Sequence, residues 1–191
     1  MTTPTIAGRN FDGITIPEPG AFTLDAAHST VGFVAKHLMV SKVRGSFTEV
    51  SGVITIADEP LQSSVDVTIG AGSITTGSPD RDKHLRSGDF LDLENHPEIT
   101  FRSTSVVSHS GSDFVLAGEL TIRGVTREVE LAVEFDGLAR SPRGQEVIAF
   151  TATTEIDREE FGITWNAALE TGGVLVGRKV KVEITAEATR A

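Results

Sequence analysis

Apolar and charged side chains alternate residue by residue along several stretches of this chain. In residues 129–135, VELAVEF, every second side chain is Val, Leu or Phe, and two of the residues between them are glutamates. Residues 179–187, KVKVEITAE, repeat the pattern with lysine and glutamate at the alternate positions. Successive side chains of a β-strand point to opposite faces, so this alternation predicts strands with one dry and one solvated face.

Eight runs of this kind account for most of the chain after residue 20. The predicted strands are residues 22–36, 43–56, 65–69, 99–107, 114–122, 128–135, 146–156 and 179–187. The first two are long and need bends, which we expect near Ala26 and at Gly45 and Gly52. Short turn sequences join the later strands, and no helical segment of ten or more residues separates them. The strands are therefore predicted to pair antiparallel.

Eight strands with one dry face can form a two-layered sandwich or a closed barrel, and the pattern leaves both open. Closure into a barrel removes both edge strands. An eight-stranded barrel has an interior that its own side chains just fill, or that holds one small or narrow ligand. The pattern alone does not decide between these two interiors.

The first 20 residues are predicted to form an irregular arm ahead of a barrel domain, residues 21–191. Residues 14–16, ITI, suit a short edge strand that Pro17 ends. The arm lacks the basic start, apolar run and cleavage site of a signal peptide. The chain also lacks a run of ~18 apolar residues that would span a membrane. We therefore expect a cytoplasmic protein without an integral membrane segment.

Residues 76–97 break the strand pattern and are predicted to form a short helix and a loop. Ser78 suits an N-cap, Pro79 the first helical position and Gly88 the end of the helix. The loop that follows carries apolar residues that need a surface to cover, so we expect a lid over one mouth of a barrel. A second short turn is predicted at Asp157, where DREE fits a capping box.

The charge and the residue types exclude several classes of function. The chain has 17 basic and 27 acidic residues, for a net charge of -10. This balance argues against a nucleic-acid-binding surface, which needs a basic patch, and against tight adhesion to anionic membranes. The chain has no cysteine, so thiolate nucleophiles and cysteine-ligated metals are excluded. The five histidines show no HxxxH or HxH spacing, and we expect neither a metal nor a cofactor.

A series of short segments carries a family resemblance. They are LDAAHS (24–29), VGFVAKHLMV (31–40), RGSF (44–47), SGVI (51–54), RDKHLRSGDFLD (81–92), PEITFRST (97–104), GELTIRGVT (118–126) and FG (161–162). In these segments the chain resembles the YceI-like, polyisoprenoid-binding family of bacterial proteins, over about residues 22–187. The resemblance implies a lipocalin-like, extended eight-stranded antiparallel barrel. It also implies an elongated apolar cavity that binds a long isoprenoid or similar lipid chain, and it brings no established catalytic residues.

We expect the barrel interior to be the binding site. The residues predicted to line it are Phe33, Phe47, Val67, Phe101, Phe114, Leu116, Leu131, Phe150, Trp165 and Val182. Each buried CH₂ of a prenyl chain contributes roughly 0.8 kcal/mol, so an apolar interior suits a polyprenyl phosphate or an isoprenoid quinone. Arg44 and Arg81 are the candidates to meet an anionic head group. The apolar corner at residues 37–40 is expected at the same mouth, in contact with the lid.

Three functions remain open at this point. The first is binding of an isoprenoid lipid for transport, storage or sequestration, without catalysis. The second is an enzyme acting on a prenyl or lipid substrate, with His84 or a lid carboxylate as general acid or base. The third is a structural or partner-binding barrel with a solid core.

The other histidines are expected to hold corners or the lid by hydrogen bonds, except His109, which we expect to be solvated. The lipid is the expected partner, and a homodimer is left open.

Overall fold

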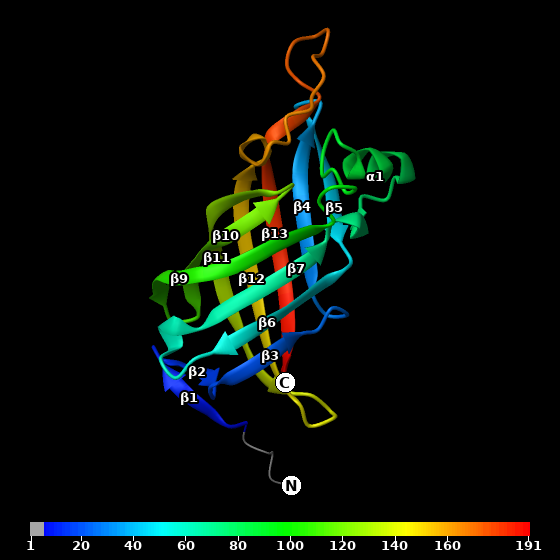
Figure 1. Cartoon of the computed structure of the whole chain (residues 1–191). Helices are drawn as coiled ribbons and strands as arrows, with labels where there is room; N and C mark the ends of the chain where they lie inside the picture. Colours follow the sequence, from blue (N-terminus) through cyan, green and yellow to red (C-terminus); the bar gives the residue numbers. More distant parts are fainter. Residues whose placement is uncertain (1–5) are drawn as a thin grey trace.

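The computed structural model describes residues 6–191, and most of these lie in antiparallel β-strands. Residues 1–5, the start of the predicted arm, fall outside the described residues. Figure 1 shows strands wrapped around one axis, with the helix α1 (Pro79–Arg86) on the outside. The end of the barrel that carries β1 (Gly8–Phe11) and β2 (Ile14–Pro17), at the bottom of Figure 1, is the lower end. The opposite end is the upper end.

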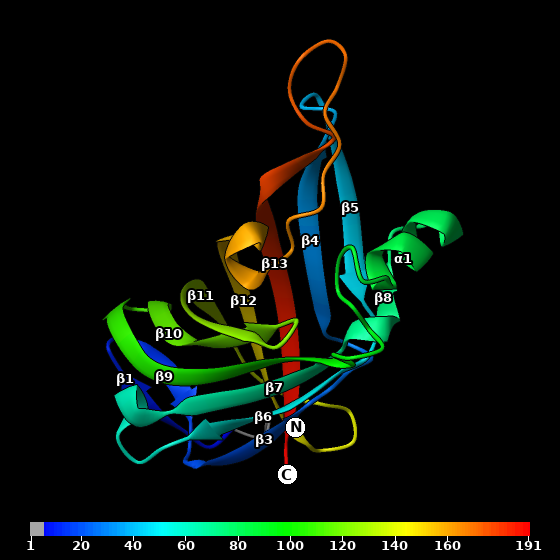
Figure 2. The ribbon, with the colours of Figure 1, turned by 45° about the horizontal axis from the view of Figure 1, so that its top comes forward.

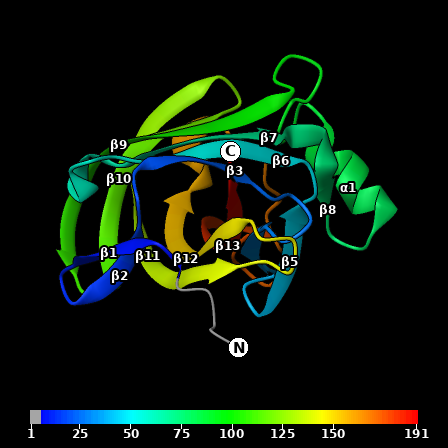
Figure 3. The ribbon, with the colours of Figure 1, turned by 90° about the horizontal axis from the view of Figure 1, so that it is seen from below.

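Eight strands close into a ring, which Figure 3 shows from below. In order around the ring they are β12 (Glu146–Asp157), β11 (Val125–Arg140), β10 (Asp113–Ile122), β9 (Glu98–Ser110), β7 (Ser64–Gly70), β6 (Val50–Ile56), β3 (Gly20–Leu24) and β13 (Val176–Arg190). Residues 147–157 of β12 pair with residues 179–189 of β13 and close the ring. The eight-stranded antiparallel barrel is therefore confirmed, and the sandwich is excluded because its edges would be free.

The first two predicted strands are each divided in the structure. The first divides into β3 and β4 (Thr30–His37), and the second into β5 (Ser41–Phe47) and β6. The long strand β13 pairs with β3 through residues 188–190 and with β4 through residues 176–185. β4 pairs with β5, and β5 with the short β8 (Ile74–Thr75), so these three strands extend the wall beyond the ring (Figure 2).

The break between β5 and β6 falls at Thr48 and Glu49, not at the glycines predicted to bend the second strand. Ser73 Oγ accepts hydrogen bonds from the backbone N–H groups of Thr48 (3.1 Å) and Glu49 (3.0 Å). Gly45 has another role, because a Cβ there would come 2.3 Å from Phe33 Cζ. The glycine lets the Phe33 ring lie flat against the neighbouring strand.

The predicted lid is confirmed as a helix followed by a docked loop. α1 begins after its N-cap, Ser78, and Pro79 is its first residue. Arg86, the last residue of α1, donates hydrogen bonds of 2.8 Å to the carbonyls of Gly72 and Ile74, just before and within β8. Arg123, in the β10–β11 turn, donates two of 2.6 Å to carbonyls of the loop that follows α1. These bonds attach the lid to two separate parts of the barrel.

Residues 8–17 form a hairpin rather than an irregular arm. β1 (Gly8–Phe11) and β2 (Ile14–Pro17) pair around Asp12 and Gly13, whose φ angles are 50° and 82°. An Asp-Gly pair favours this two-residue turn because positive φ costs little at both positions. Pro17 is fully buried, and the hairpin lies beside β11 at the lower end (Figure 3).

Three 3₁₀ turns complete the connections: η1 (Pro60–Gln62), η2 (Ala71–Ser73) and η3 (Arg158–Phe161). Asp157 accepts a hydrogen bond from the N–H of Glu159 (3.0 Å), which confirms the turn predicted at Asp157. The core includes the inward faces of the ring, with the fully buried Phe22 on β3, and extends to the fully buried Phe161 of η3. Within residues 6–191, no helix has the length and apolar character needed to cross a membrane.

Candidate ligand-binding cavity

The barrel encloses an elongated cavity of about 410 Å³. Its lining residues come from every strand of the ring, from β4 and β5, and from covers at both ends. This volume falls within the roughly 300–1,000 Å³ of small-molecule sites and is far larger than an ordinary packing void. The alternative of a solid core is therefore wrong for this chain.

Nine of the ten residues predicted to line the interior do line this cavity. They are Phe33, Phe47, Val67, Phe101, Phe114, Leu116, Leu131, Phe150 and Val182. Every second residue of a barrel strand faces inward, so strict alternation is enough to place them. Leu116 and Leu131, for example, are direct partners across β10 and β11, and both are buried.

The N-terminal hairpin closes the lower end of the cavity. Phe11 and three further hairpin residues line it. The Phe11 and His109 ring centroids are 5.3 Å apart, and Asp12 Oδ2 lies 3.2 Å from His109 Nδ1. The Gly111 N–H, and then His109, lower the pKa of the Asp12 carboxyl by hydrogen bonding. His109 thus joins the hairpin to the barrel, which corrects its prediction as a merely solvated loop residue.

The upper part of the cavity is covered by the lid and by the segment around η3. Leu85, Phe90 and Leu91 line it from the lid, and Phe161 and Ile163 from the other side. These two covers come from distant parts of the chain, and side-chain contacts join them.

Trp165 makes such a contact. Its ring centroid lies 4.7 Å from that of His84 and 5.3 Å from that of Phe90. His84 Nε2 in turn lies 2.8 Å from Asp89 Oδ2. Trp165 is absent from the described residues that line the cavity, so its prediction as a lining residue is wrong. It lies outside any strand, and strand alternation therefore does not set its direction.

Arg158 is a buried cation in the upper cavity wall, with 4% of its surface exposed. Its guanidinium donates four hydrogen bonds of 2.8 to 3.3 Å to the backbone carbonyls of Ile163, Trp165, Val176 and Gly177. A guanidinium has five N–H groups, so one N–H of Nη2 has no acceptor within residues 6–191. Burial lowers the pKa of Arg158, and the charges of Glu159 and Asp157 oppose that effect.

Arg158 is a functional candidate that the sequence reasoning missed. Among the described residues that line the cavity, it alone is Lys, Arg, Asp or Glu. The available signal was an arginine inside an acidic capping sequence, DREE, directly after a strand with an inward apolar face. The capping box predicts the turn but not that it directs the arginine inward.

Arg44 and Arg81, the predicted head-group residues, are not among the cavity-lining residues. Arg44 is the cross-strand partner of Val34, and its Nη1 lies 3.5 Å from Glu183 Oε2. Arg81 donates hydrogen bonds to Thr76 Oγ1 (2.8 Å) and to the Thr76 carbonyl (3.1 Å). Both side chains are engaged outside the cavity, because they lie on the outward face of a strand and on an exposed helix.

The apolar corner at residues 37–40 lies at the upper end, with a different neighbour from the one predicted. The Leu38 N–H donates a hydrogen bond to the Leu175 carbonyl (2.9 Å). A Cβ on Gly173 would come 3.3 Å from Met39 Cγ. The corner therefore contacts the loop of residues 166–175, while α1 lies lower on the wall in Figures 1 and 2.

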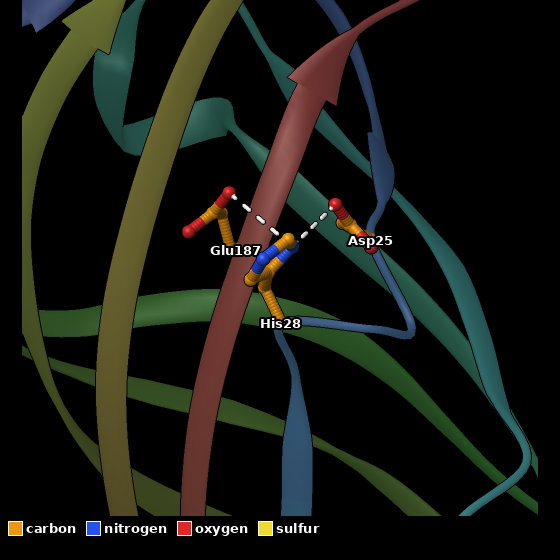
Figure 4. Close-up of side chains that lie close together, drawn as sticks. All are labelled: Asp25, His28 and Glu187. Carbon is orange, nitrogen blue, oxygen red and sulfur yellow. Dashed lines mark hydrogen bonds and ion pairs between the residues drawn. The ribbon is translucent and has the colours of Figure 1, made fainter. Parts of the chain in front are cut away.

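His28 holds the corner between β3 and β4, as Figure 4 shows. Atoms of Asp25, His28 and Glu187 lie within 4.8 Å of one another, close enough in principle to share a metal ion. In the structure, His28 Nδ1 is 2.8 Å from Asp25 Oδ2 and 3.9 Å from Glu187 Oε1. The hydrogen bond lowers the pKa of Asp25 and raises that of His28. This is the hydrogen-bonded corner that the sequence predicted for a histidine.

The cavity is lined mainly by apolar side chains, with a few serines and threonines, Arg158 in the upper wall and His109 at the lower end. A general acid or base must lie within hydrogen-bond reach of its substrate. His84, one of the two candidates of the enzyme alternative, packs on Trp165 outside the cavity lining, and the other, a lid carboxylate, is not among the described lining residues either. The arrangement suits an elongated apolar molecule with one polar group near Arg158.

Comparison with known proteins gives relatives along most of the chain. A family model described as the YceI-like domain matches residues 22–188. A UPF0312 protein of Staphylococcus aureus, strain USA300, is 42% identical over 168 residues, which cover 87% of this chain and 95% of the relative.

Three solved structures are similar to this one. BcnA of Burkholderia cenocepacia has a TM-score of 0.74 at 23% identity, covering 87% of this chain and 99% of that chain. The Campylobacter jejuni YceI protein has a TM-score of 0.70 at 29% identity, covering 82% and 90%. A polyisoprenoid binding domain from Saccharophagus degradans has a TM-score of 0.68 at 16% identity, covering 89% and 98%. The barrel, the extent of the family match and the identity to the staphylococcal relative lead to one conclusion: the chain belongs to the YceI-like domain family.

Proposed function

We propose that this protein binds a long-chain isoprenoid lipid in the barrel cavity and transports, stores or sequesters it without chemical change. The cavity carries the proposal, because its wall is apolar over the length of the barrel. Burial of each prenyl CH₂ contributes roughly 0.8 kcal/mol, which several isoprene units multiply. Ordering of a flexible chain opposes this gain and keeps the net affinity far below the sum.

Membership in the family supports the same class of ligand. The domain from Saccharophagus degradans, which shares this fold, is described as polyisoprenoid binding. An elongated cavity that is closed below by an apolar hairpin suits a chain that enters tail first. A polyprenyl phosphate and an isoprenoid quinone both have such a tail and a polar head.

We place the polar head of the ligand beside Arg158. Arg158 lines the cavity, and one N–H of its guanidinium has no acceptor within residues 6–191, although an unsatisfied buried donor is costly. A phosphate or quinone oxygen would accept a charge-assisted hydrogen bond there. The tail would then extend toward the N-terminal hairpin, along walls formed by Phe114, Leu116 and Leu131.

Two experiments test the proposal. Organic extraction of the protein purified from a native-like host, followed by mass spectrometry, should release an isoprenoid in near-stoichiometric amount. Delipidated protein should then bind farnesyl phosphate roughly tenfold or more tighter than farnesol, since hydrogen bonds to charged groups contribute about 1.5–3 kcal/mol. A protein that releases no lipid and binds neither compound would overturn the proposal.

The location of the protein belongs to the same proposal. We infer that its site of action is the cytoplasm. Fractionation of cells that express the tagged protein tests it, with a periplasmic marker and a cytoplasmic marker in parallel.

A further inference from the structure

The turn between β4 and β5 exposes three successive apolar side chains at the upper end of the molecule. Leu38 is 41% exposed, Met39 52% and Val40 87%. Within the part of the chain that the structure describes, they make up half of the six exposed large hydrophobic residues. Figures 1 and 2 show this turn projecting beyond the ring, beside the loop of residues 166–175.

The backbone of this turn is unfavourable for the residues it contains. Leu38 and Met39 have φ angles of 52° and 63°, and the Val40 N–H donates to the His37 carbonyl (3.2 Å). Such turns favour Asn-Gly and Asp-Gly, because side chains with a Cβ are strained at positive φ. The β1–β2 turn of this same chain follows that preference with Asp-Gly. Strain kept at an exposed apolar turn points to a use for the side chains themselves.

Two lysines lie just below the turn. Lys36 and Lys42 are direct cross-strand partners on β4 and β5, and both are exposed. Like charges in this arrangement repel each other. Further down the wall, Arg44 of β5 and Lys181 of β13 are both paired with Glu183. Neither Lys36 nor Lys42 has an ion pair within residues 6–191. An anionic partner from outside would relieve the repulsion.

The turn is continuous with the cavity. Its first flanking residue, His37, pairs with Val176 of β13. Val176 lines the cavity, and its carbonyl accepts one of the hydrogen bonds of Arg158. On the same strand as the turn, Ala35 also lines the cavity. The inner face of β4 therefore connects the proposed head-group position with the exposed turn.

We propose that the β4–β5 turn docks on the surface of an anionic lipid bilayer, where the ligand passes between membrane and cavity. The inference rests on the proposed function. Leu38, Met39 and Val40 would enter the boundary between head groups and acyl chains, and Lys36 and Lys42 would meet lipid phosphates. The net charge of -10, and the exposed Glu170 on the neighbouring loop, keep the contact weak and reversible, as a carrier requires.

Flotation with vesicles of equal parts phosphatidylcholine and phosphatidylglycerol tests the docking. Wild-type protein should float with the vesicles, and the double variant Leu38→Asn, Met39→Gly should partition about tenfold less. The Asn-Gly pair suits the turn, so the variant should stay folded with an unchanged or higher thermal midpoint. The variant Lys36→Gln, Lys42→Gln should lose binding to these vesicles. The matched control is Val107→Asn, which removes an exposed apolar residue from the barrel wall and should float like wild type.

Loading with farnesyl phosphate from ethanol separates this inference from the proposed function. The Asn-Gly variant should load from ethanol like wild type and load more slowly from vesicles. Failure of every protein to load would reject the proposed function itself. The docking alone would be rejected if loading from ethanol is normal but wild type and the Asn-Gly variant float equally. It would also be rejected if loading is normal and neither protein floats. A wild-type dimer that this variant converts to a monomer, with flotation unaltered, would identify the turn as a contact between two copies and also reject the docking.

Discussion

At the scale of single residues, the inward face of β10 gives the sharpest test of the cavity. Phe114 lines the cavity, with its ring centroid 6.3 Å from that of Phe150. Phe114→Asp would place a carboxylate in an apolar wall, and we expect farnesol binding to fall by about a hundredfold or more. Titration calorimetry measures this, with Val107→Asp on an exposed position as the control. A folded Phe114→Asp variant that binds like wild type would show that this wall does not contact the ligand.

Arg158 should serve both stability and ligand choice. Lysine has three donors and no planar fork, so Arg158→Lys cannot satisfy four carbonyls and should destabilise the fold by about 1–3 kcal/mol. The preference for farnesyl phosphate over farnesol should shrink in the same variant. The control is Arg178→Lys, because Arg178 is 60% exposed and a lysine at this position can still pair with Asp157 and Glu159. An unchanged preference in folded Arg158→Lys would show that this residue has only a structural role.

His28 makes the stability depend on pH. Hydrogen bonding to Asp25 and the nearby charge of Glu187 raise the pKa of His28 above its ordinary value of about 6.5. A raised pKa contributes stability that is complete below the ordinary value and is lost as the pH rises through the raised one. The thermal midpoint should therefore fall more between about pH 6 and 8 in wild type than in His28→Gln. Thermal midpoints that change equally with pH in wild type and His28→Gln would contradict this.

Asp25, the partner of His28, makes stability depend on pH in the opposite direction in acid. Its pKa is lowered, first by the hydrogen bond to His28, so its contribution to the stability of the fold is present above the ordinary value of about 3.9. It is lost as the pH falls through the lowered pKa. Asp25→Asn should therefore show a shallower loss of stability on acidification than wild type, which acid titration monitored by circular dichroism measures.

At the scale of elements, the contact between lid and loop should set the rate of ligand exchange. Trp165 joins the lid to the segment after η3 without lining the cavity. Trp165→Ala should therefore speed the release of bound farnesol severalfold while changing its affinity less, and Trp165→Phe should retain most of the slow release. Stopped-flow displacement measures these rates. Equal release from wild type and Trp165→Ala would show that the ligand leaves by another route.

The strands and the lid could be predicted from the sequence because their causes are local. Alternation sets which face of β10 and β11 is inward, and Ser78 with Pro79 marks the start of α1. The break at Thr48 could not be found this way, because it depends on a hydroxyl 25 residues away, that of Ser73. Contacts of the same long-range kind decide the positions of Arg158 and Trp165, which sequence reasoning missed or misplaced. The cavity lining and the lid were therefore predictable, whereas the hairpin that closes the lower end, the place of Trp165 and the buried cation were not.

At the scale of the whole molecule, ligand binding should stabilise the barrel against heat. A ligand that binds only the folded state adds about 2.7 kcal/mol at a hundredfold excess over its dissociation constant. For a chain of this length that corresponds to a rise in the thermal midpoint of roughly 5–10 °C. Unfolding followed by circular dichroism with and without farnesyl phosphate tests this, with Phe114→Asp as the variant that should not respond. A midpoint that is insensitive to the ligand in wild type would argue against binding inside the barrel.

The position of β13 in the chain has a consequence for biosynthesis. This strand closes the ring against β12 and also pairs with β3 and β4, yet it is the last strand to leave the ribosome. Until it emerges, the nascent chain carries unpaired edges on both sides of the gap, and such edges invite aggregation. Translation that stops before residue 176 would release an open sheet with its apolar face uncovered, a substrate for chaperones and proteases rather than a barrel with weaker binding.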